Sequence, residues 1–427
     1  MFTSRLLWLG LFAAALSVVF LIGALQLRPE GFQRGPAGTR IAFTGGGGAC
    51  VECHARTSPG IVEQHARSAH AVEGVTCQDC HEVREDHFAA VEHYGTFVAT
   101  TPTSATCAQC HLTEVNQFLR SRHALPAWVA MTGVEALENS PEFMALYEQV
   151  EERGILDPVR NSLFAMEGPE ITRFACAECH GIGRPNPDGS VGNCTSCHLR
   201  HEYSLEQARK PETCNACHIG PDHPQFEIYE ESPHGIAYAT MGHTWHWEAE
   251  PGTLTVSDFP AATCAICHIS GFGRQGTTHD VGERLSWFLH SEISERRPGW
   301  QENAMRMQQV CHECHSQRFV SDFYRDADIL TVRINEMVEE SQTLMAELQE
   351  EGHLTPEPFD QIIDFEYFEL WHHWGRTAKF GAWMQGPDYT QWHGVYEMIR
   401  SAAHLVEAAT ELRGHHAPAA ASGEAMR

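Results

Sequence analysis

The sequence predicts a mainly α-helical protein, and three observations support this fold class. Every cysteine belongs to a Cys-x-x-Cys-His motif, helix-start signals stand between motifs, and apolar residues recur at helical spacing after the last motif. Eight motifs account for all 16 cysteines, so no thiol remains for a disulfide or a nucleophile. The first cysteines of the motifs are Cys50, Cys77, Cys107, Cys176, Cys194, Cys214, Cys264 and Cys311.

Each motif contains the residues that attach one c-type haem. Two cysteines three apart lie on one side of a helical turn, where they form thioethers with the haem vinyl groups, and the next histidine ligates the iron. The second cysteines are Cys53, Cys80, Cys110, Cys179, Cys197, Cys217, Cys267 and Cys314, and the proximal histidines are His54, His81, His111, His180, His198, His218, His268 and His315. Zinc knuckles and thioredoxin-type sites also use Cys-x-x-Cys, but they need no trailing histidine. The sequence therefore predicts a multihaem cytochrome c with eight covalent haems packed as the core.

The composition limits the partners of the chain. Its formal net charge is −27, which argues against nucleic acid as a ligand. The acidic surface serves solubility in the simplest interpretation, and it also provides a field that would steer a basic redox partner. An apolar fraction of 42% is that of a globular protein.

The N-terminus contains a candidate membrane segment. Residues 6–27 carry no charge over 22 positions, which is about 33 Å of helix and matches the hydrocarbon core of a bilayer. We expect residues 1–27 to be an N-terminal membrane anchor, with a cleaved signal peptide as the alternative. Because c-type haems are attached outside the cytoplasm, the body would lie at the periplasmic face of the inner membrane, or free in the periplasm after cleavage.

Composition also divides the rest of the chain. Residues 28–49 are rich in Gly and Pro and are expected to be a flexible linker. The motifs define an octahaem-binding domain over 50–320, which a C-terminal helical region over 321–413 follows. Residues 414–427, which include His415 and His416, are predicted to be a disordered tail.

Several helices are predicted from local signals. Pro141 follows the candidate N-cap Ser140, and a long amphipathic helix is expected to end at Gly352. The apolar positions of that helix are Ile329, Val332, Met337, Val338, Leu344, Met345 and Leu348. Further helices are expected from Phe359 to about Trp374 and from about Gln391 past Ile399. The simplest role of this haem-free region is packing against the body, and its aromatic content also suits oligomerisation.

The remaining 20 histidines exceed the number of distal ligands that the haems require. Eight haems with two histidines each need eight further ligands, and one open haem reduces this number to seven. Three candidates share a Ser-x-His pattern, namely His70, His123 and His234, and the next candidates are His93, His201, His279 and His393. His372 and His373 are possible substitutes. For each candidate, a surface or hydrogen-bonding histidine remains the alternative interpretation.

Three stretches resemble the hydroxylamine oxidoreductase family of octahaem cytochromes. They are CNACHIGPDHP at 214–224, TTHDVGERLSW at 277–287 and DYTQWHG at 388–394. The resemblance extends over about 50–398, and Gly-Pro-Asp-His-Pro directly after a haem motif is its most specific part. It implies seven electron-carrying haems with two histidine ligands and a fourth haem, on Cys176 and Cys179, whose open side binds a nitrogen substrate.

The resemblance also implies site residues. Asp222 and His223 would be the acid-base pair over the open haem, although Asp222 could instead be a simple turn-former after Pro221. A tyrosine from the neighbouring subunit of a homotrimer would be joined covalently to that haem, with Tyr389 as the first candidate and Tyr396 as the second.

These assignments imply an enzyme that oxidises hydroxylamine to nitric oxide or nitrite. Electrons would leave through the other haems to a cytochrome or a quinone-linked partner. One alternative is an octahaem reductase of nitrite or hydroxylamine, because family members without the tyrosine link work in that direction. A multihaem electron conduit without catalysis is the other alternative.

Overall fold

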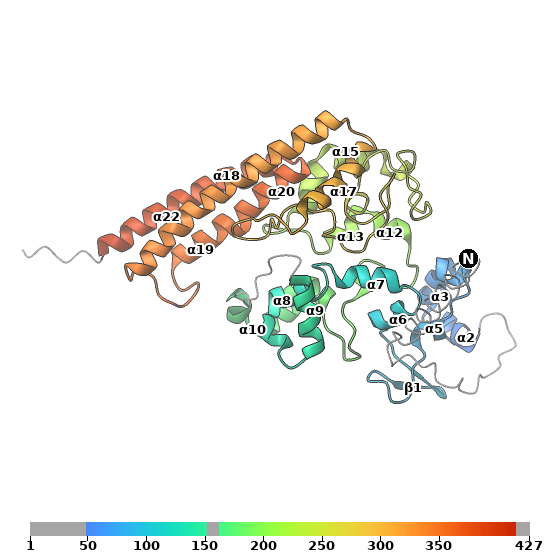
Figure 1. Cartoon of the computed structure of the whole chain (residues 1–427). Helices are drawn as coiled ribbons and strands as arrows, with labels where there is room; N and C mark the ends of the chain where they lie inside the picture. The colour runs from blue at the N-terminus through green and yellow to red at the C-terminus, as the bar shows by residue number, and fades with distance from the viewer. Residues whose placement is uncertain (1–47, 152–161, 416–427) are drawn as a thin grey trace, which may run out of the picture. The chain divides into compact units, whose positions relative to one another are not determined.

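The computed structural model describes residues 48–151 and 162–415, and the structural statements below concern these residues (Figure 1). The predicted membrane segment 1–27 and almost all of the predicted linker lie outside them, as do residues 416–427 of the predicted tail. None of the described helices combines the length and the apolar character needed to cross a membrane.

The described chain is mainly helical, as predicted, and it forms two compact units. One unit contains residues 48–53 and His81–Thr100, and the other contains His54–Cys80 and residues 101–415. The helices before the C-terminal region are α2 (Gly48–Thr57), α3 (Pro59–Arg67), α4 (Ala69–Val72), α5 (Cys77–His81), α6 (Ser104–Ala108), α7 (Leu112–Leu119), α8 (Leu125–Thr132), η1 (Val134–Leu137), α9 (Pro141–Glu151), α10 (Ser162–Phe174), α11 (Cys176–His180), η2 (Gly181–Gly183), η3 (Cys194–Ser196), α12 (Leu205–Arg209), α13 (Pro211–Asn215), α14 (Gln225–Glu231), α15 (Pro233–Met241), η4 (Gly242–Thr244), α16 (Cys264–His268) and α17 (Trp300–His312).

The described residues contain one sheet, a two-stranded hairpin in the smaller unit. Strand β1 (Val91–His93) pairs antiparallel with β2 (Thr96–Val98), and His93 faces Thr96 across the ladder. The two turn residues Tyr94 and Gly95 both have positive φ, of 51° and 84°. A two-residue turn of this kind matches the twist of the strands that it joins.

The C-terminal region is a helical bundle in the larger unit. It consists of α18 (Gln317–Glu350), α19 (Ile362–Phe368), η5 (Glu369–Gly375), α20 (Arg376–Met384), α21 (Pro387–Thr390), η6 (Gln391–Val395) and α22 (Tyr396–His415). Figure 1 shows α18 and α22 lying side by side, with α19 beside them. Ile334, Val338, Leu348, Met398 and Leu405 form the centre of their common core. The segments η5 and η6 are π-helical, so the predicted helix from Phe359 to Trp374 is in fact an α-helix that widens into a π-helix.

The long amphipathic helix was predicted correctly in extent but only partly in its buried face. It ends at Glu350, just before Gly352, which has a φ of 77°. Val338 and Leu348 are fully buried, whereas Ile329 and Val332 are 62% and 48% exposed. These two residues lie on the side of α18 that no described neighbour covers, because the bundle packs instead on Val320, Ala327 and Thr331. The bundle also extends past its predicted C-terminal boundary at residue 413, since α22 includes Gly414.

Two smaller cores hold the motif region of the larger unit. Around α8 and α9, Leu125, Val129 and Tyr147 are buried together, and α9 begins at Pro141 as the sequence predicts. Around α16 the core is aromatic, with Trp245, Trp247, Leu254, Phe259, Ile266 and Phe272. Neither cluster is large for a chain of this length, as expected if haems supply much of the apolar contact area.

Gly394 tests the close contact between η6 and α20. A Cβ atom at this position would lie 2.7 Å from both Cα and Cβ of Ala378. We predict that Gly394→Ala forces the two helices apart and lowers the stability of the protein by about 1–3 kcal/mol, measured as a lower midpoint of thermal unfolding. Gly414, on the exposed side of α22, has nothing within 4 Å of such a Cβ atom. Gly414→Ala should therefore leave the midpoint unchanged or raise it, and equal destabilisation by both changes would contradict the packing described.

Candidate functional site

The haem-attachment motifs adopt helical turns. The histidine N–H of a motif donates to the carbonyl of its first cysteine at 2.9 Å in Cys107–His111, 3.0 Å in Cys194–His198, 2.9 Å in Cys214–His218 and 2.8 Å in Cys311–His315. This turn brings the two cysteines and the histidine to one side of the backbone, which is the arrangement that haem attachment requires. All 16 cysteines lie in the described residues, and none of them forms a disulfide there.

Neighbouring motifs of the larger unit lie against one another. Cysteine side chains from different motifs lie close enough to interact in three pairs, namely Cys107 with Cys194, Cys214 with Cys264, and Cys179 with Cys217. The thiol pKa values indicate two further places where neighbouring motifs lie against one another. Burial and then the nearby Cys214 raise the pKa of Cys197 to about 11, and burial and then Cys311 raise that of Cys267 to about 12. Motifs three, five, six, seven and eight thus form a continuous series, and motif four joins it at motif six.

Four motif histidines face a second histidine at the separation that one haem iron would occupy. The ring centroids are 6.0 Å apart for His111 and His70, 5.9 Å for His218 and His123, 6.3 Å for His198 and His279, and 6.0 Å for His315 and His234. With metal–nitrogen bonds of roughly 2 Å, two imidazoles on opposite sides of one iron have centroids about 6 Å apart. The residues present therefore fit four haems with two histidine ligands.

Buried serines position the distal histidines of the Ser-x-His pattern. Ser68 Oγ accepts a hydrogen bond from the Ala71 N–H at 3.1 Å, and Ser232 Oγ accepts one from the Gly235 N–H at 3.1 Å. Each serine is thereby the N-cap of the short helix that carries its histidine. At the third site, Ser121 Oγ accepts from the His123 N–H itself at 3.2 Å. The shared sequence pattern thus has a physical cause, which is the orientation of the distal imidazole.

The remaining candidate ligands are His93, His201 and His393. His93 is on strand β1, and the His201 N–H donates to Gln64 Oε1 at 3.3 Å. His393 is exposed, with Nε2 3.1 Å from Asp388 Oδ2, and its ring stacks on Tyr389 with centroids 4.8 Å apart. The second tyrosine candidate, Tyr396, is 47% exposed at the start of α22.

Asp222 and His223 form a directly bonded pair on the turn after motif six. His223 Nδ1 lies 2.7 Å from Asp222 Oδ2, and both side chains are about one-third exposed. The turn is fixed on both sides: Gly220, with a φ of 90°, donates its N–H to Glu227, and Thr377 of α20 donates to the Pro221 carbonyl at 3.1 Å. The C-terminal bundle therefore holds the predicted acid-base pair in place.

The Asp222–His223 pair lies close enough to motif four for electrostatic interaction with its residues. Burial is the largest cause that lowers the pKa of His180, and the charges of His223 and Asp222 also act on it. Asp222 likewise acts on Cys176. His180 Nδ1 is 2.6 Å from the carbonyl of Ala127, which leaves Nε2 for a metal. The structure thus brings together Asp222, His223 and the fourth motif, as the resemblance implies.

The ionisation of Asp222 follows from its neighbours. Burial alone would raise its pKa, but the hydrogen bond and the charge of His223 outweigh burial. The charges of His372 and Arg376 act in the same direction, so the pKa of Asp222 lies well below its usual value. Asp222 therefore remains a carboxylate and accepts the hydrogen bond from His223.

Sequence reasoning missed three residues around the pair, His290, Arg376 and Lys379, and named His372 only as a possible substitute ligand. The His290 ring lies 5.2 Å from that of His223, and Arg376 Nε donates to the His290 carbonyl at 2.7 Å. His372 is buried beside Arg376, and the fully buried Lys379 donates to Ser294 Oγ at 2.7 Å. Burial and then Arg376 lower the pKa of Lys379 to about 7. A basic residue on an apolar helix face, as at Lys379, was the one signal in the sequence that could have identified this group.

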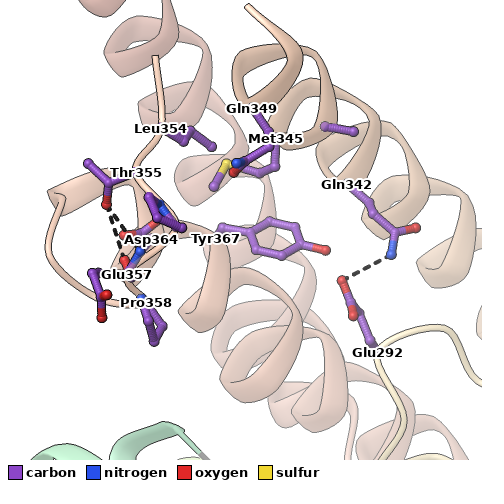
Figure 2. Close-up of a pocket in the computed structure, with 12 residues that line it drawn as sticks. Glu292, Gln342, Met345, Gln349, Leu354, Thr355, Glu357, Pro358, Asp364 and Tyr367 are labelled. Carbon is purple, nitrogen blue, oxygen red and sulfur yellow. Dashed lines mark hydrogen bonds between the residues drawn. The ribbon is translucent and has the colours of Figure 1, made fainter. Parts of the chain in front are cut away.

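A separate pocket of about 410 Å³ lies in the bundle, between α18 and the loop that leads into α19 (Figure 2). The ring of Tyr367 points into it, and Gln342 Nε2 donates to Glu292 at 3.4 Å across one side (Figure 2). Its lining contains no motif residue and neither member of the Asp222–His223 pair. The lining of this pocket is therefore distinct from the haem-attachment motifs and from the acid-base pair.

Comparison with known proteins agrees with this geometry. The family described as "Seven times multi-haem cytochrome CxxCH" matches residues 73–360. That segment contains seven of the eight motifs, and the motif at Cys50 precedes it. The site and the fold define a multihaem c-type cytochrome, and the chain belongs to this family.

One curated protein and two solved structures are similar to this chain. The chain is 25% identical over 378 residues to a probable nitrite reductase-hydroxylamine oxidoreductase fusion protein of Kuenenia stuttgartiensis, which covers 72% of the chain but only 38% of that protein. A solved structure of a hypothetical multihaem protein shares the fold with a TM-score of 0.73 and 22% identity, over 86% of this chain and 95% of that one. A reducing HAO-like protein complex of K. stuttgartiensis has a TM-score of 0.63 at 20% identity, over 86% and 85% of the two chains. The two solved structures show the shared fold, and the chain spans 38% of the length of the curated relative that it matches.

The His234–His315 pair provides a test of the ligand assignment. We predict that His234→Ala leaves the number of covalent haems unchanged, because the cysteines are intact, but converts one low-spin ferric haem to high-spin. The difference between variant and unmutated protein in ferric EPR spectra measures this change. His246→Ala serves as the control, since His246 is exposed and bonded to Asp258. Identical spectra for His234→Ala and the unmutated protein would contradict the pairing.

Proposed function

We propose that the chain is an octahaem oxidoreductase of the hydroxylamine oxidoreductase type, which oxidises hydroxylamine to nitric oxide or nitrite. The haem on Cys176, Cys179 and His180 would bind the substrate, and the other haems would carry its electrons away. The observation that carries the proposal is the Asp222–His223 pair, which is held beside motif four by the C-terminal bundle. The pairs around His111, His198, His218 and His315 support a contrasting, electron-carrying role for those haems.

Cys176, Cys179 and His180 would hold this haem, which would supply an iron able to bind the nitrogen substrate and to take up its electrons. The protein residues handle the protons that the oxidation releases. Asp222 is ionised and bonded to His223 Nδ1, so it orients the ring and leaves Nε2 as the nitrogen that accepts a proton. The turn between Gly220 and Pro224 fixes this geometry, because α20 holds the carbonyl of Pro221.

The series of motifs supports a route for the electrons. From motif four they would pass to motif six through the contact of Cys179 with Cys217. Two directions are then open, toward motifs seven and eight or toward motifs five and three. A cytochrome or a quinone-linked protein would accept them at an end of the series. We place this exchange at the periplasmic face of the inner membrane, because c-type haems are attached outside the cytoplasm.

A second candidate function is the reduction of nitrite or hydroxylamine at the same haem. Arg376, whose charge acts on Asp222, favours it because a cation suits an anionic substrate better than a neutral one. A relative with a similar fold is described as a reducing HAO-like complex. Oxidation and reduction would use the same site residues, and they would differ only in the tyrosine link.

The acid-base pair gives the first functional prediction. Asp222→Asn and His223→Ala should each lower the turnover of hydroxylamine by about 10²-fold or more, the range of general acid-base groups. Haem content should stay unchanged, because neither residue attaches a haem. Asp258→Asn serves as a control for the loss of an Asp–His contact, since Asp258 pairs with the exposed His246. Turnover close to that of the unmutated protein in both site variants would reject the proposed role.

The tyrosine link gives the second functional prediction. A covalent bond between Tyr389 and the haem of a neighbouring subunit requires an oligomer, so the unmutated protein should run as cross-linked chains on a denaturing gel. Tyr389→Phe should abolish the cross-link and shift activity from hydroxylamine oxidation toward reduction, whereas Tyr396→Phe should keep both properties. If the unmutated protein already runs as a single chain and shows only ordinary c-type absorption bands, the reductive function becomes the better account.

A further inference from the structure

Arg284 is a buried cation that is bonded directly to motif seven. The residue is 2% exposed, and its Nη1 group donates to the carbonyls of Ile266 and Cys267 at 3.2 and 2.8 Å. Both acceptors belong to α16 (Cys264–His268), which is motif seven itself. This helix holds both cysteines and the histidine of the motif on one turn, so the residues fit a covalent haem. The guanidinium group therefore lies against the turn that would carry the seventh haem.

The hydrogen bonds of Arg284 leave its charge in place. Its Nη2 group donates to the carbonyls of Ser270 and Gly276 at 3.0 and 2.8 Å, so both terminal nitrogens are bonded to neutral backbone groups. The charge of Glu283 acts on Arg284, but the carboxylate of Glu283 pairs with Arg306 at 3.3 Å. Because arginine stays protonated in proteins, Arg284 presents a fixed positive charge to motif seven.

The same segment acts on the proximal histidine of motif seven. Burial and then the charge of Arg284 lower the pKa of His268 to about 4. The backbone of Val281, three residues before Arg284, also lies close enough to interact with the His268 ring. Residues 281–284 therefore lie beside both the backbone of motif seven and the histidine that would ligate its iron.

The other branch of the motif series has a charge of the opposite sign. Glu114 Oε2 lies 4.0 Å from Nδ1 of His111, the proximal histidine of motif three. Burial lowers the pKa of His279, which faces the motif-five histidine, and the charge of Glu114 opposes this effect. Both branches begin at motif six, because Cys214 lies beside motif five on one side and motif seven on the other. A carboxylate thus serves one branch and a cation the other.

These two charges act oppositely on the reduction of a haem. A ferric haem carries one more positive charge than a ferrous haem, so a nearby cation destabilises the oxidised form and a nearby carboxylate stabilises it. Water screens exposed charges more than buried ones. Arg284 is buried, whereas the side chain of Glu114 is 44% exposed. The larger change in potential is therefore expected at motif seven.

We propose that Arg284 raises the reduction potential of the haem on motif seven and so directs electrons from motif six toward motifs seven and eight. The step moves one electron, which oxidises motif six and reduces motif seven. Arg284 acts through the motif and touches no substrate, so it is a positioning residue of the electron route. The inference rests on the proposed function for the origin of the electrons, but the effect on the potential does not depend on the substrate.

The test uses the full-length haem-loaded protein and measures haem potentials by spectroelectrochemical titration. Arg284→Gln removes the charge, and Arg284→Met gives a second neutral variant of similar volume in case the first loses haem, which mass spectrometry detects. Arg284→Lys keeps the charge but has three N–H donors instead of five, so it separates charge from structural contacts. Arg209→Gln is the matched control, because Arg209 is also buried and donates to the carbonyls of Trp247 and Ala249, outside the motifs.

The neutral variants should lower the equilibrium constant for reduction of one haem by about tenfold or more, which is ~59 mV for one electron. Arg284→Lys should keep most of the potential, and Arg209→Gln should change none. Equal shifts in Arg284→Lys and the neutral variants would show that Arg284 only ties α16 to its neighbouring loop, and would overturn the proposal. The absence of any shift in the neutral variants would also overturn it.

The direction of electron flow needs one further variant, Glu114→Gln. It should raise the potential on its own branch by less than Arg284→Gln lowers the other, because water screens the exposed carboxylate. In the unmutated protein, the haem that responds to Arg284 should be reduced before the haem that responds to Glu114. The reverse order would contradict the direction. The titration needs no substrate, so hydroxylamine turnover by the unmutated protein tests the proposed function separately.

Discussion

The structure depends on one constraint, which is that a haem iron with two histidine ligands would take its imidazoles from two sides while its ring is tied to two cysteines. The motif provides one imidazole from the adjacent residue, so the second must come from another segment. His70 and His111, His123 and His218, His198 and His279, and His234 and His315 bring together segments that are far apart in the chain. Short helices capped by buried serines suffice for this purpose, because the iron, and not a large side-chain core, connects them.

The proposed catalytic site at motif four differs from these pairs of facing histidines. Beside motif four the structure provides a bonded carboxylate and imidazole, with buried cations behind them. These cations come from the C-terminal bundle, whose π-helical segment η5 contains His372 and is followed directly by Arg376. A π-helix widens the turn by one residue and often occurs at functional sites. The bundle is therefore part of the site, and packing alone does not account for it.

Most of what could be predicted came from the Cys-x-x-Cys-His and Ser-x-His motifs. Cysteine spacing predicted the helical multihaem fold, and the Ser-x-His pattern identified three histidines that face motif histidines, because a serine hydrogen bond to the neighbouring backbone is a local feature. His279 also faces a motif histidine, His198, whereas His393 contacts Asp388 and stacks on Tyr389. The position of Arg376 and His372 near Asp222 could not be predicted, because it depends on contacts between α20 and a turn more than 150 residues earlier. Ile329 and Val332 show the same limit, since periodicity indicates an apolar stripe but not which part of it a neighbour covers.

The central claim is that one haem has an open iron while the others have two histidine ligands. Quantitative EPR of the fully oxidised, full-length protein tests it most directly, because an open ferric haem is high-spin and a bis-histidine haem is low-spin. The account predicts one high-spin haem per chain, whose signal alone changes when hydroxylamine or nitrite is added. A spectrum in which every haem is low-spin, and in which neither compound has an effect, would contradict it and favour a conduit for electrons.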